Sequence, residues 1–453
     1  MRCKGVRGEI TVFLTLLFFI VSALTLTVTE SARAQAIRVQ TERVMQTSIH
    51  SGFGEYNREL LSYYRLLAID TSYRGDSGSV ENLRAHLKEY AEENFRSSDP
   101  SDQKSDWLKL EAGDLTVKRH QLLSDENGGV LIDQAVKEMR AQGELENRAD
   151  ILRESQLMKR QDDSFMDRFS QAVSMAGNEE INPAAAVLEM ASGLDLLHMV
   201  LRDAPPSARM FSGCASKRSL QKGNCDGKFK LTDNGTHLFD AYLLRYFGTY
   251  VKPCDHAVFD CEIEYLIAGK GKEEDSCREC AKKILSQRLV QNLNGFEGND
   301  EVIRKTEELA DEICSLGYGD RYYTQRSLLY AWVYAESVVE VSRLLNGGRA
   351  DMDGYSDPQV VPLEELTDFI GYCASCGGSG EDYEDYLTGL LALTATRTKA
   401  LRCMDLIELN IRRAGYGGFQ TDTSVTYFQA EMRVNSGYGH SCRIEREYGY
   451  LFP

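Results

Sequence analysis

Residues 10–29, ITVFLTLLFFIVSALTLTVT, form an uncharged apolar stretch close to the N-terminus. About 20 helical residues, at about 1.5 Å each, cross the hydrocarbon core of a bilayer. The basic residues Arg2, Lys4 and Arg7 precede the stretch, and basic residues beside a span stay in the cytoplasm. We therefore expect a single-pass protein of the cell membrane that contacts lipid through residues 10–29. Its N-terminus should be cytoplasmic and its C-terminal domain extracytoplasmic.

Three interpretations of the N-terminus differ in which residues the mature chain keeps. Ala32-Arg33-Ala34 has the form of a signal-peptidase site, but the apolar run is longer than the core of a usual signal peptide, and Glu30 and Arg33 crowd the site. The second interpretation is an anchor that is simply retained. In the third, a basic cytoplasmic leader, residues 1–8, is removed and the apolar segment is kept.

Two short segments resemble the TadE/TadG-like pseudopilins of tight-adherence pilus systems: RGEITVFL at residues 7–14 and ESAR at residues 30–33. The resemblance implies a small leader, one apolar helix and an outer domain, with processing between Gly8 and Glu9. It also implies partners among other pilin-like or platform membrane proteins. Phe13 stands at the fifth position after the Gly8–Glu9 junction, where pilin-type segments carry Glu.

The spanning helix should continue outside the membrane, because no Gly or Pro occurs from Glu9 through Ser51. We therefore treat residues 9–51 as the transmembrane helix and its outward extension. A narrow stripe at helical spacing follows the span and is formed by Ala34, Ile37, Thr41, Val44 and Ser48. Such a stripe either rests on the protein's own domain or forms a seam between copies.

The rest of the chain predicts an α+β fold: a mostly helical outer domain with a smaller antiparallel β part that includes a C-terminal hairpin. Residues 52–210 form a first helical and mixed region, and residues 211–453 form a cysteine-containing helical region that ends in strands. Apolar periodicity predicts helices at 144–176, from Asn182 to 201, and at 238–251, 275–294, 301–315, 322–345 and 383–413. Short strands and turns are expected at 106–133, and a hairpin around the Gly437-Tyr438-Gly439 turn.

Charge limits the possible partners of the outer domain. The chain of 453 residues has a formal net charge of −17, and its first nine residues are net basic, so residues 10–453 carry −19. A surface this acidic repels nucleic acid and anionic lipid headgroups. We expect no nucleic-acid partner.

Eleven of the twelve cysteines follow the span, and none of these precedes Cys214. Exported cysteines usually pair, but an odd count leaves at least one thiol over, so paired and reduced states both stay open. The sharpest local patterns are the CxxC pairs Cys277/Cys280 and Cys373/Cys376. They lie too far apart in sequence for a zinc knuckle, which leaves structural disulfides, idle thiols or, less favoured, redox or metal chemistry. We predict no metal and no cofactor.

No catalytic motif for a hydrolase, metalloprotease or nucleotide enzyme occurs in the sequence, so we predict no enzyme and no catalytic residues. Three blocks resemble an uncharacterised family of large, single-span bacterial proteins: EYNRELL at 55–61, EYLIAG at 264–269 and MDLIELNIR at 404–412. That family implies no catalytic residues either. Domain packing with buried ion pairs is a sufficient explanation of the blocks.

The sequence therefore predicts a membrane-anchored structural or assembly component of a pilus or secretion apparatus. Thr11, Thr15, Ser22 and Ala23 are small or hydroxylated residues of the kind that lets helices associate in a bilayer. The alternatives are a tethered surface binding or sensory domain and, less favoured, an exported enzyme.

Overall fold

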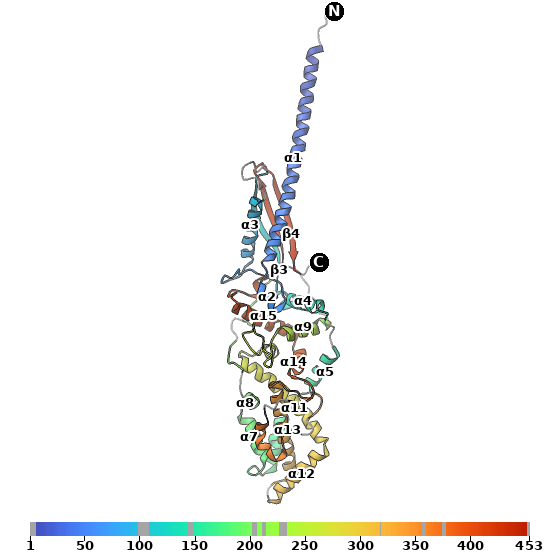
Figure 1. The fold of residues 1–453 in the computed structure, drawn as a ribbon, viewed down its shortest axis with the longest axis vertical. Helices are drawn as coiled ribbons and strands as arrows, with labels where there is room; N and C mark the ends of the chain where they lie inside the picture. Colours follow the sequence, from blue (N-terminus) through green and yellow to red (C-terminus); the bar gives the residue numbers. More distant parts are fainter. Residues whose placement is uncertain are drawn as a thin grey trace, which may run out of the picture.

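The computed structural model describes residues 6–97, 108–143, 148–201, 206–210, 214–225, 233–317, 319–355, 359–373 and 377–450. The molecule is elongated, with the helix α1 projecting from one end and the helical body forming the other (Figure 1). The fold is α+β, as the sequence predicts.

The elements follow one another along the chain in this order: α1 (Val6–Gly54), α2 (Arg58–Tyr64), β1 (Ile69–Asp70), α3 (Val80–Ser97), β2 (Leu110–Leu122), α4 (Asp125–Ala141), α5 (Arg148–Met158), α6 (Phe165–Ala176), α7 (Pro183–Gly193), α8 (Leu196–Val200), η1 (Ala215–Lys217), α9 (Asp233–Tyr246), α10 (Glu262–Ala268), α11 (Glu273–Glu297), α12 (Asp300–Ser315), α13 (Arg321–Leu345), η2 (Leu363–Tyr372), α14 (Tyr383–Leu393), α15 (Thr396–Arg413), η3 (Thr421–Thr423), β3 (Ser424–Ser436) and β4 (Ser441–Gly449).

A small antiparallel sheet lies beside the C-terminal half of α1 (Figure 1). Its central strand is β3, which pairs with β2 along one edge and with β4 and the short β1 along the other. The predicted C-terminal hairpin is confirmed: Asn435 pairs with Ser441 across the turn, and Gly439 adopts a positive φ of 82° that suits glycine.

The second half of α1 belongs to the core of this sheet. Val44, Met45, Ile49 and Phe53 pack with apolar residues of α3, β2 and β3 in one buried cluster. The stripe predicted after the span is buried from Ile37 onwards, so it rests on the protein's own domain. Ala34, at its start, is exposed.

The helical body surrounds α13, in which Thr324 and every residue from Ser327 to the end of the helix are buried. The helix predicted at 322–345 is therefore confirmed. Its neighbours are α6, α7, α11 and α12, and this larger core draws residues from both of the regions expected for the outer domain.

Four predictions of local structure are wrong. Residues 106–133 do not form several short strands, because the described part contains the single strand β2, with register shifts against β3, followed by α4. The single helix expected at 144–176 is α5 and α6, separated by a turn in which Asp162 accepts hydrogen bonds from the backbone and hydroxyl of Ser164 at 2.9 and 2.7 Å. Residues 144–147 lie outside the described residues.

The helix expected at 383–413 is likewise divided, into α14 and α15. The break at Thr394 and Ala395 lets the buried Lys399 side chain turn back, so that its ammonium donates to the backbone carbonyl of Leu391 at 3.0 Å and to Asp240. The helix predicted from Asn182 to 201 also breaks, after Gly193, and resumes as α8. None of these breaks contains a proline.

Candidate functional site

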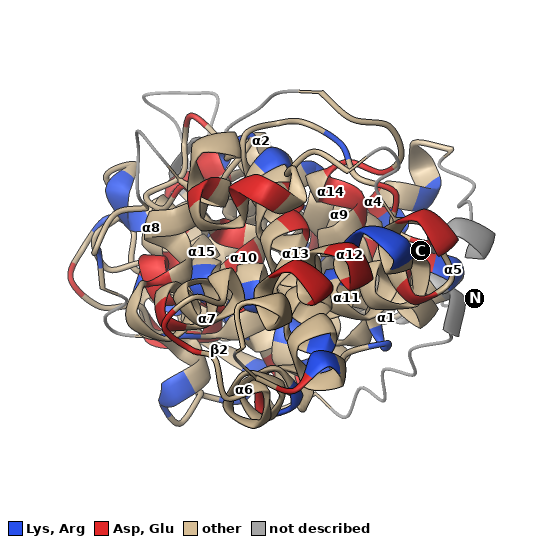
Figure 2. Ribbon diagram, turned by 90° about the horizontal axis from the view of Figure 1, so that it is seen from below, with Lys and Arg blue, Asp and Glu red and all other residues tan. Residues whose placement is uncertain are grey.

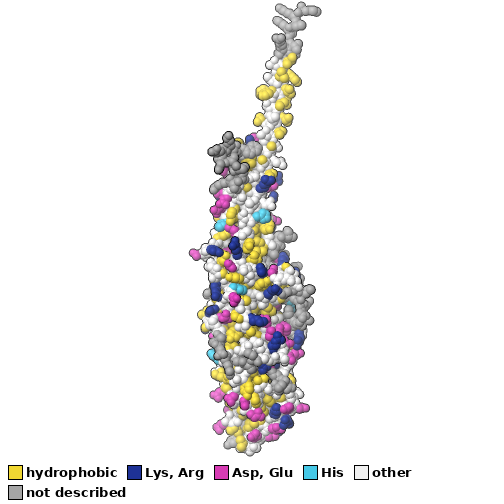
Figure 3. Space-filling view, viewed as in Figure 1, with side chains coloured by type: hydrophobic (Ala, Val, Ile, Leu, Met, Phe, Trp, Pro, Cys, Tyr) yellow, Lys and Arg dark blue, Asp and Glu magenta, His cyan; other side chains and the backbone are white. Residues whose placement is uncertain are grey.

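The projecting part of α1 exposes its apolar side chains, and Figure 3 shows them on the face that it draws. Phe13, Phe18 and Phe19 are 66, 69 and 70% exposed. Within the described residues, α1 is the one helix long and apolar enough to cross a membrane. Thr15 and Thr25 donate to backbone carbonyls of the preceding turn at 2.9 and 2.8 Å, so they add no unpaired donor to an apolar surrounding.

A polar collar forms between α1 and the β3–β4 turn where the apolar segment of α1 ends. We define the collar as Glu30 and Arg33 on α1 with Tyr438 and His440 in the β3–β4 turn. Glu30 accepts from Arg33 at 2.7 Å and lies 3.1 Å from the His440 ring nitrogen. The Arg33 guanidinium stands 4.3 Å from the centre of the Tyr438 ring. Aromatic and basic side chains of this kind favour the water interface of a membrane.

An aromatic cluster at the far end of α1 fixes the helix to the sheet. The Phe53 ring stacks on Phe428 of β3, with centroids 4.8 Å apart and planes 7° apart. Tyr448 and Tyr450 meet the Phe53 ring edge-on, and the Tyr450 hydroxyl donates to the Phe53 carbonyl at 2.6 Å. Phe53 is 5% exposed, so the cluster excludes water and holds the helix end in one orientation.

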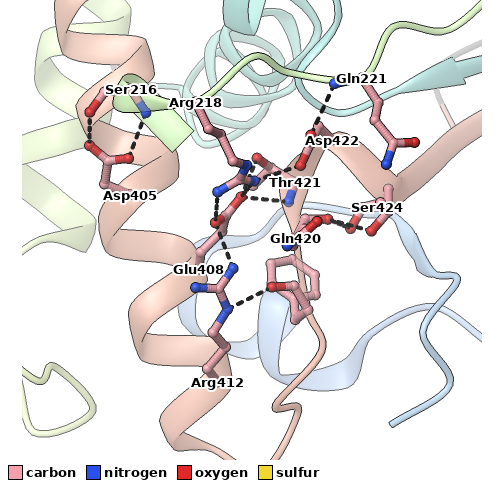
Figure 4. A network of polar contacts seen from close by, with 12 residues as sticks. Ser216, Arg218, Gln221, Asp405, Glu408, Arg412, Gln420, Thr421, Asp422 and Ser424 are labelled. Atoms are coloured by element: carbon pink, nitrogen blue, oxygen red, sulfur yellow. Dashed lines mark hydrogen bonds and ion pairs between the residues drawn. The ribbon is translucent and has the colours of Figure 1, made fainter. Parts of the chain in front are cut away.

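A network around Glu408 connects the helical body to the sheet (Figure 4). The Glu408 carboxylate, on α15, accepts hydrogen bonds from two guanidinium nitrogens of Arg218 at 2.8 and 2.6 Å and from Arg412 at 2.9 Å. It also accepts the backbone N–H and hydroxyl of Thr421, both at 2.9 Å, immediately before β3. Arg218 extends the network to Asp422 at 2.6 Å.

The neighbouring contact in Figure 4 ties the loop that carries Arg218 to the same helix. Asp405 accepts the backbone N–H of Ser216 at 2.9 Å and its hydroxyl at 2.6 Å, and also accepts the Tyr265 hydroxyl at 2.7 Å. Glu408 and Asp405 both belong to the block 404–412 that the sequence analysis singled out. Their carboxylates hold α15, α10, the 214–225 loop and the start of β3 together, which is a structural task.

Two buried carboxylates of α10 hold the 248–250 segment. Glu262 accepts the backbone N–H of Gly248 at 2.8 Å, and Glu264 accepts that of Tyr250 at 3.0 Å. Glu264 also accepts the Tyr383 hydroxyl at 3.0 Å. Burial raises the pKa of each carboxyl to about 7, against the lowering effect of these hydrogen bonds. The pair therefore takes up protons near neutral pH.

Three of the four cysteines singled out in the sequence lie within the described residues. Cys277 and Cys280 lie one turn apart inside α11 and are both fully buried, and the Cys280 thiol donates to the Glu264 carbonyl at 3.7 Å. Burial, followed by the nearby Glu264 charge, raises the pKa of the Cys280 thiol, which opposes the thiolate form that redox chemistry needs. Cys373 is buried at the end of η2, and Cys376 lies outside the described residues.

Gly8 and Glu9 are both helical residues of α1. No group of three or more His, Cys, Asp or Glu residues that could hold a metal ion occurs within the described ranges.

A surface groove of about 750 Å³ lies between α6, α7 and η2. Figure 1 shows α7 near the end of the molecule opposite the N-terminus. Its apolar wall includes Val173, Ile181 and Leu188. Thr367 of η2 closes it from a segment almost two hundred residues further along the chain. Sequence reasoning missed this groove, because no local motif links segments so far apart.

A family model described as "Family of unknown function (DUF5702)" matches residues 174–436, more than half of the chain. The matched region begins within α6 and ends with the last residue of β3, so it includes most of the groove, the Glu408 network and the buried carboxylates. No curated protein and no solved structure matches the chain.

Proposed function

Because the chain belongs to this family of unknown function, which supplies no activity to carry over, we propose a function from geometry. The protein is a membrane-anchored, extracytoplasmic structural or assembly component of a pilus or secretion apparatus, similar to the TadE/TadG-like pseudopilins. Residues 10–29 would cross the membrane, and residues 52–453 would lie outside the cytoplasm.

The observation that carries the proposal is the continuity of α1. One helix, Val6–Gly54, has an exposed apolar half and a second half built into the core of the sheet. A simple tether needs no such rigid connection, because a flexible linker holds a domain at a membrane equally well. A rigid connection transmits the position of the transmembrane segment to the outer domain, which suits a subunit that is assembled through its helix.

The collar supports the same orientation. Arg33, Tyr438 and His440 gather where the apolar part of α1 ends, which places interfacial side chains at one depth. In the proposed arrangement this depth is the outer surface of the membrane.

Leader removal between Gly8 and Glu9 is part of the proposal and has a separate test. The mass of the protein extracted from native membranes should correspond to a chain that begins at Glu9. A mass that includes Met1 would contradict processing while leaving the anchor in place.

Replacing residues 10–29 with an unrelated transmembrane sequence of equal length tests the assembly role. The variant should still insert in the membrane and keep its fold, but its crosslinks to neighbouring membrane proteins and the assembly of pili or the secretion of cargo should be lost. Unchanged crosslinks and assembly would contradict the proposal. Circular dichroism and membrane fractionation of the same variant control for folding and insertion.

A tethered binding domain is the second candidate, favoured by the groove between α6, α7 and η2. The same replacement separates the two functions. Binding at the groove should survive a change of anchor sequence, whereas assembly through the helix should not.

A further inference from the structure

The groove lies at the end of the molecule that would be farthest from the membrane, and Figure 2 views the structure from that end. Most of its lining side chains are exposed, including Ser170, Ser174 and Ser192. The groove is therefore open, whereas a site for a small molecule typically encloses most of its ligand. An open groove of this volume suits an extended segment of a protein.

The apolar wall of the groove is partly exposed to solvent. Ile181 has 40% of its surface exposed. Leu188 and Pro183 of α7 are half-buried and continue the apolar wall. An exposed apolar wall with a polar rim is typical of an interaction surface.

The charged part of the groove has one sign. Glu179, Glu180 and Glu189 line it, and no Lys or Arg does. All three carboxylates are exposed, and across the described ranges no basic side chain forms an ion pair with any of them. The groove therefore presents three negative charges that no described residue of this chain neutralises.

The loop that carries Glu179 and Glu180 is held in place by contacts with α13. The buried Asn182 side chain donates to Ser327 of α13 at 2.9 Å and to Asn178 at 3.1 Å, and Asn178 donates to Thr324 at 2.9 Å. Asn182 also caps α7 by accepting the N–H of Ala184 at 3.0 Å. Both ends of the segment 179–181 are thus fixed, so a ligand would bind without the cost of ordering the loop.

We propose that this groove binds an exposed segment of another protein that combines apolar side chains with Lys or Arg. The apolar side chains would contact Val173, Ile181 and Leu188, and the cations would meet Glu179, Glu180 and Glu189. A second copy of this chain is a poor occupant, because its net charge of −17 would place like charges together. The inference goes beyond the proposed assembly role and does not depend on how the anchor associates.

The test uses the full-length protein in phosphatidylcholine nanodiscs. The probe is a fluorescent, amidated ten-residue peptide of alternating Lys and Leu, and the comparison peptide has Glu in place of Lys. Fluorescence anisotropy should show saturable binding of the Lys/Leu peptide above that of empty nanodiscs and at least tenfold weaker binding of the Glu/Leu peptide. Raising the salt from 50 to 500 mM should weaken the Lys/Leu complex severalfold.

The decisive variant is E179K/E180K/E189K, and its matched control is E89K/E93K/E111K, which changes the net charge equally at exposed positions on α3 and β2. Binding of the Lys/Leu peptide should fall at least tenfold in the first and less than twofold in the second. I181S, which keeps every charge, should weaken binding about threefold or more.

Three results would overturn the proposal: no saturable binding of the Lys/Leu peptide, equal losses in the two triple variants, or full affinity in I181S. A groove occupied by a second copy would instead reveal itself in analytical ultracentrifugation, as self-association of the wild type that E179K/E180K/E189K abolishes. That result would also reject the proposed partner. Because none of these readouts involves pilus assembly or the anchor sequence, failure here is distinguishable from failure of the proposed function.

Discussion

At the scale of single residues, the most consequential groups are the buried carboxylates. Glu264 has no exposed surface and one of its oxygens has no hydrogen-bond partner in the described structure. Burial raises the pKa of this carboxyl from 4.5 to about 7. Below pH 4.5 the carboxyl is neutral in both the folded and unfolded states. As the pH rises towards 7 and beyond, the unfolded chain ionises more readily, so the folded state loses stability.

Replacing Glu264 with Gln should remove this loss. The amide oxygen can still accept from Tyr250 and Tyr383, and the NH₂ group takes the place of the unpartnered oxygen. A rise of this size in the pKa means that ionising Glu264 costs the folded state about 3 kcal/mol more than the unfolded state. At pH 8.5 the free energy of unfolding of E264Q should therefore exceed that of the wild type by about 2–3 kcal/mol. At pH 4.5 the two should be nearly equal.

Chemical denaturation at a series of pH values measures the difference. Part of the pH dependence should remain in E264Q, because the pKa of Glu262 is also raised to about 7. E308Q, at an exposed position on α12, should follow the wild type at every pH. If the free energy of unfolding of E264Q depended on pH as strongly as that of the wild type, ionisation of Glu264 would cost the folded state little free energy.

At the scale of elements, the sequence predicts best where local signals act alone. The unbroken run from Glu9 to Ser51 predicts α1, and the Gly437-Tyr438-Gly439 turn predicts the β3–β4 hairpin. The breaks between α5 and α6 and between α14 and α15 escape prediction because no proline marks them. They depend on tertiary contacts, such as that of Lys399 with Asp240 on α9, and a periodic apolar pattern continues across each of them.

Replacing Phe53 with Ala should loosen α1 from the sheet. Removal of a buried aromatic ring costs about 3–5 kcal/mol, and here the loss falls on the single cluster that holds the end of α1 against Phe428, Tyr448 and Tyr450. We expect amide hydrogen exchange to accelerate by at least tenfold in residues 37–53 while exchange in α13 stays unchanged, because local opening need not involve the separate helical core.

Val39 provides the matched control for Phe53. It lies on the same helix but is 43% exposed, so V39A should change the exchange of residues 37–53 by less than threefold. Equal acceleration in α1 and α13 of F53A would mean that the two cores unfold as one unit.

At the scale of the whole molecule, the two hydrophobic cores stabilise different parts of the chain. The core around the sheet fixes α1, and the core around α13 builds the distal end with its groove. The Glu408 network joins them. The sequence pointed to the block that contains Glu408 but not to the partners of this residue. Arg218 lies far away in the sequence and Thr421 lies beyond the end of α15, so only the fold brings them to Glu408. The groove could not be predicted for the same reason.

The proposed orientation of the molecule in the membrane has a direct test. If the basic residues Arg2, Lys4 and Arg7 stay in the cytoplasm, the helical body lies outside, and a reagent can reach a cysteine placed on it without opening the cell.

Asp163, exposed in the turn between α5 and α6, suits the substitution D163C, because every cysteine recorded in the described residues is buried or half-buried. A membrane-impermeant maleimide should label D163C to the same extent in intact spheroplasts and in lysed ones, with little labelling of the wild type at the corresponding peptide. A cytoplasmic protein with an exposed cysteine should be labelled only after lysis. Labelling of D163C that also requires lysis would place the body in the cytoplasm and reverse the proposed topology, leaving the rigid connection between α1 and the sheet as a feature of an inward-facing protein.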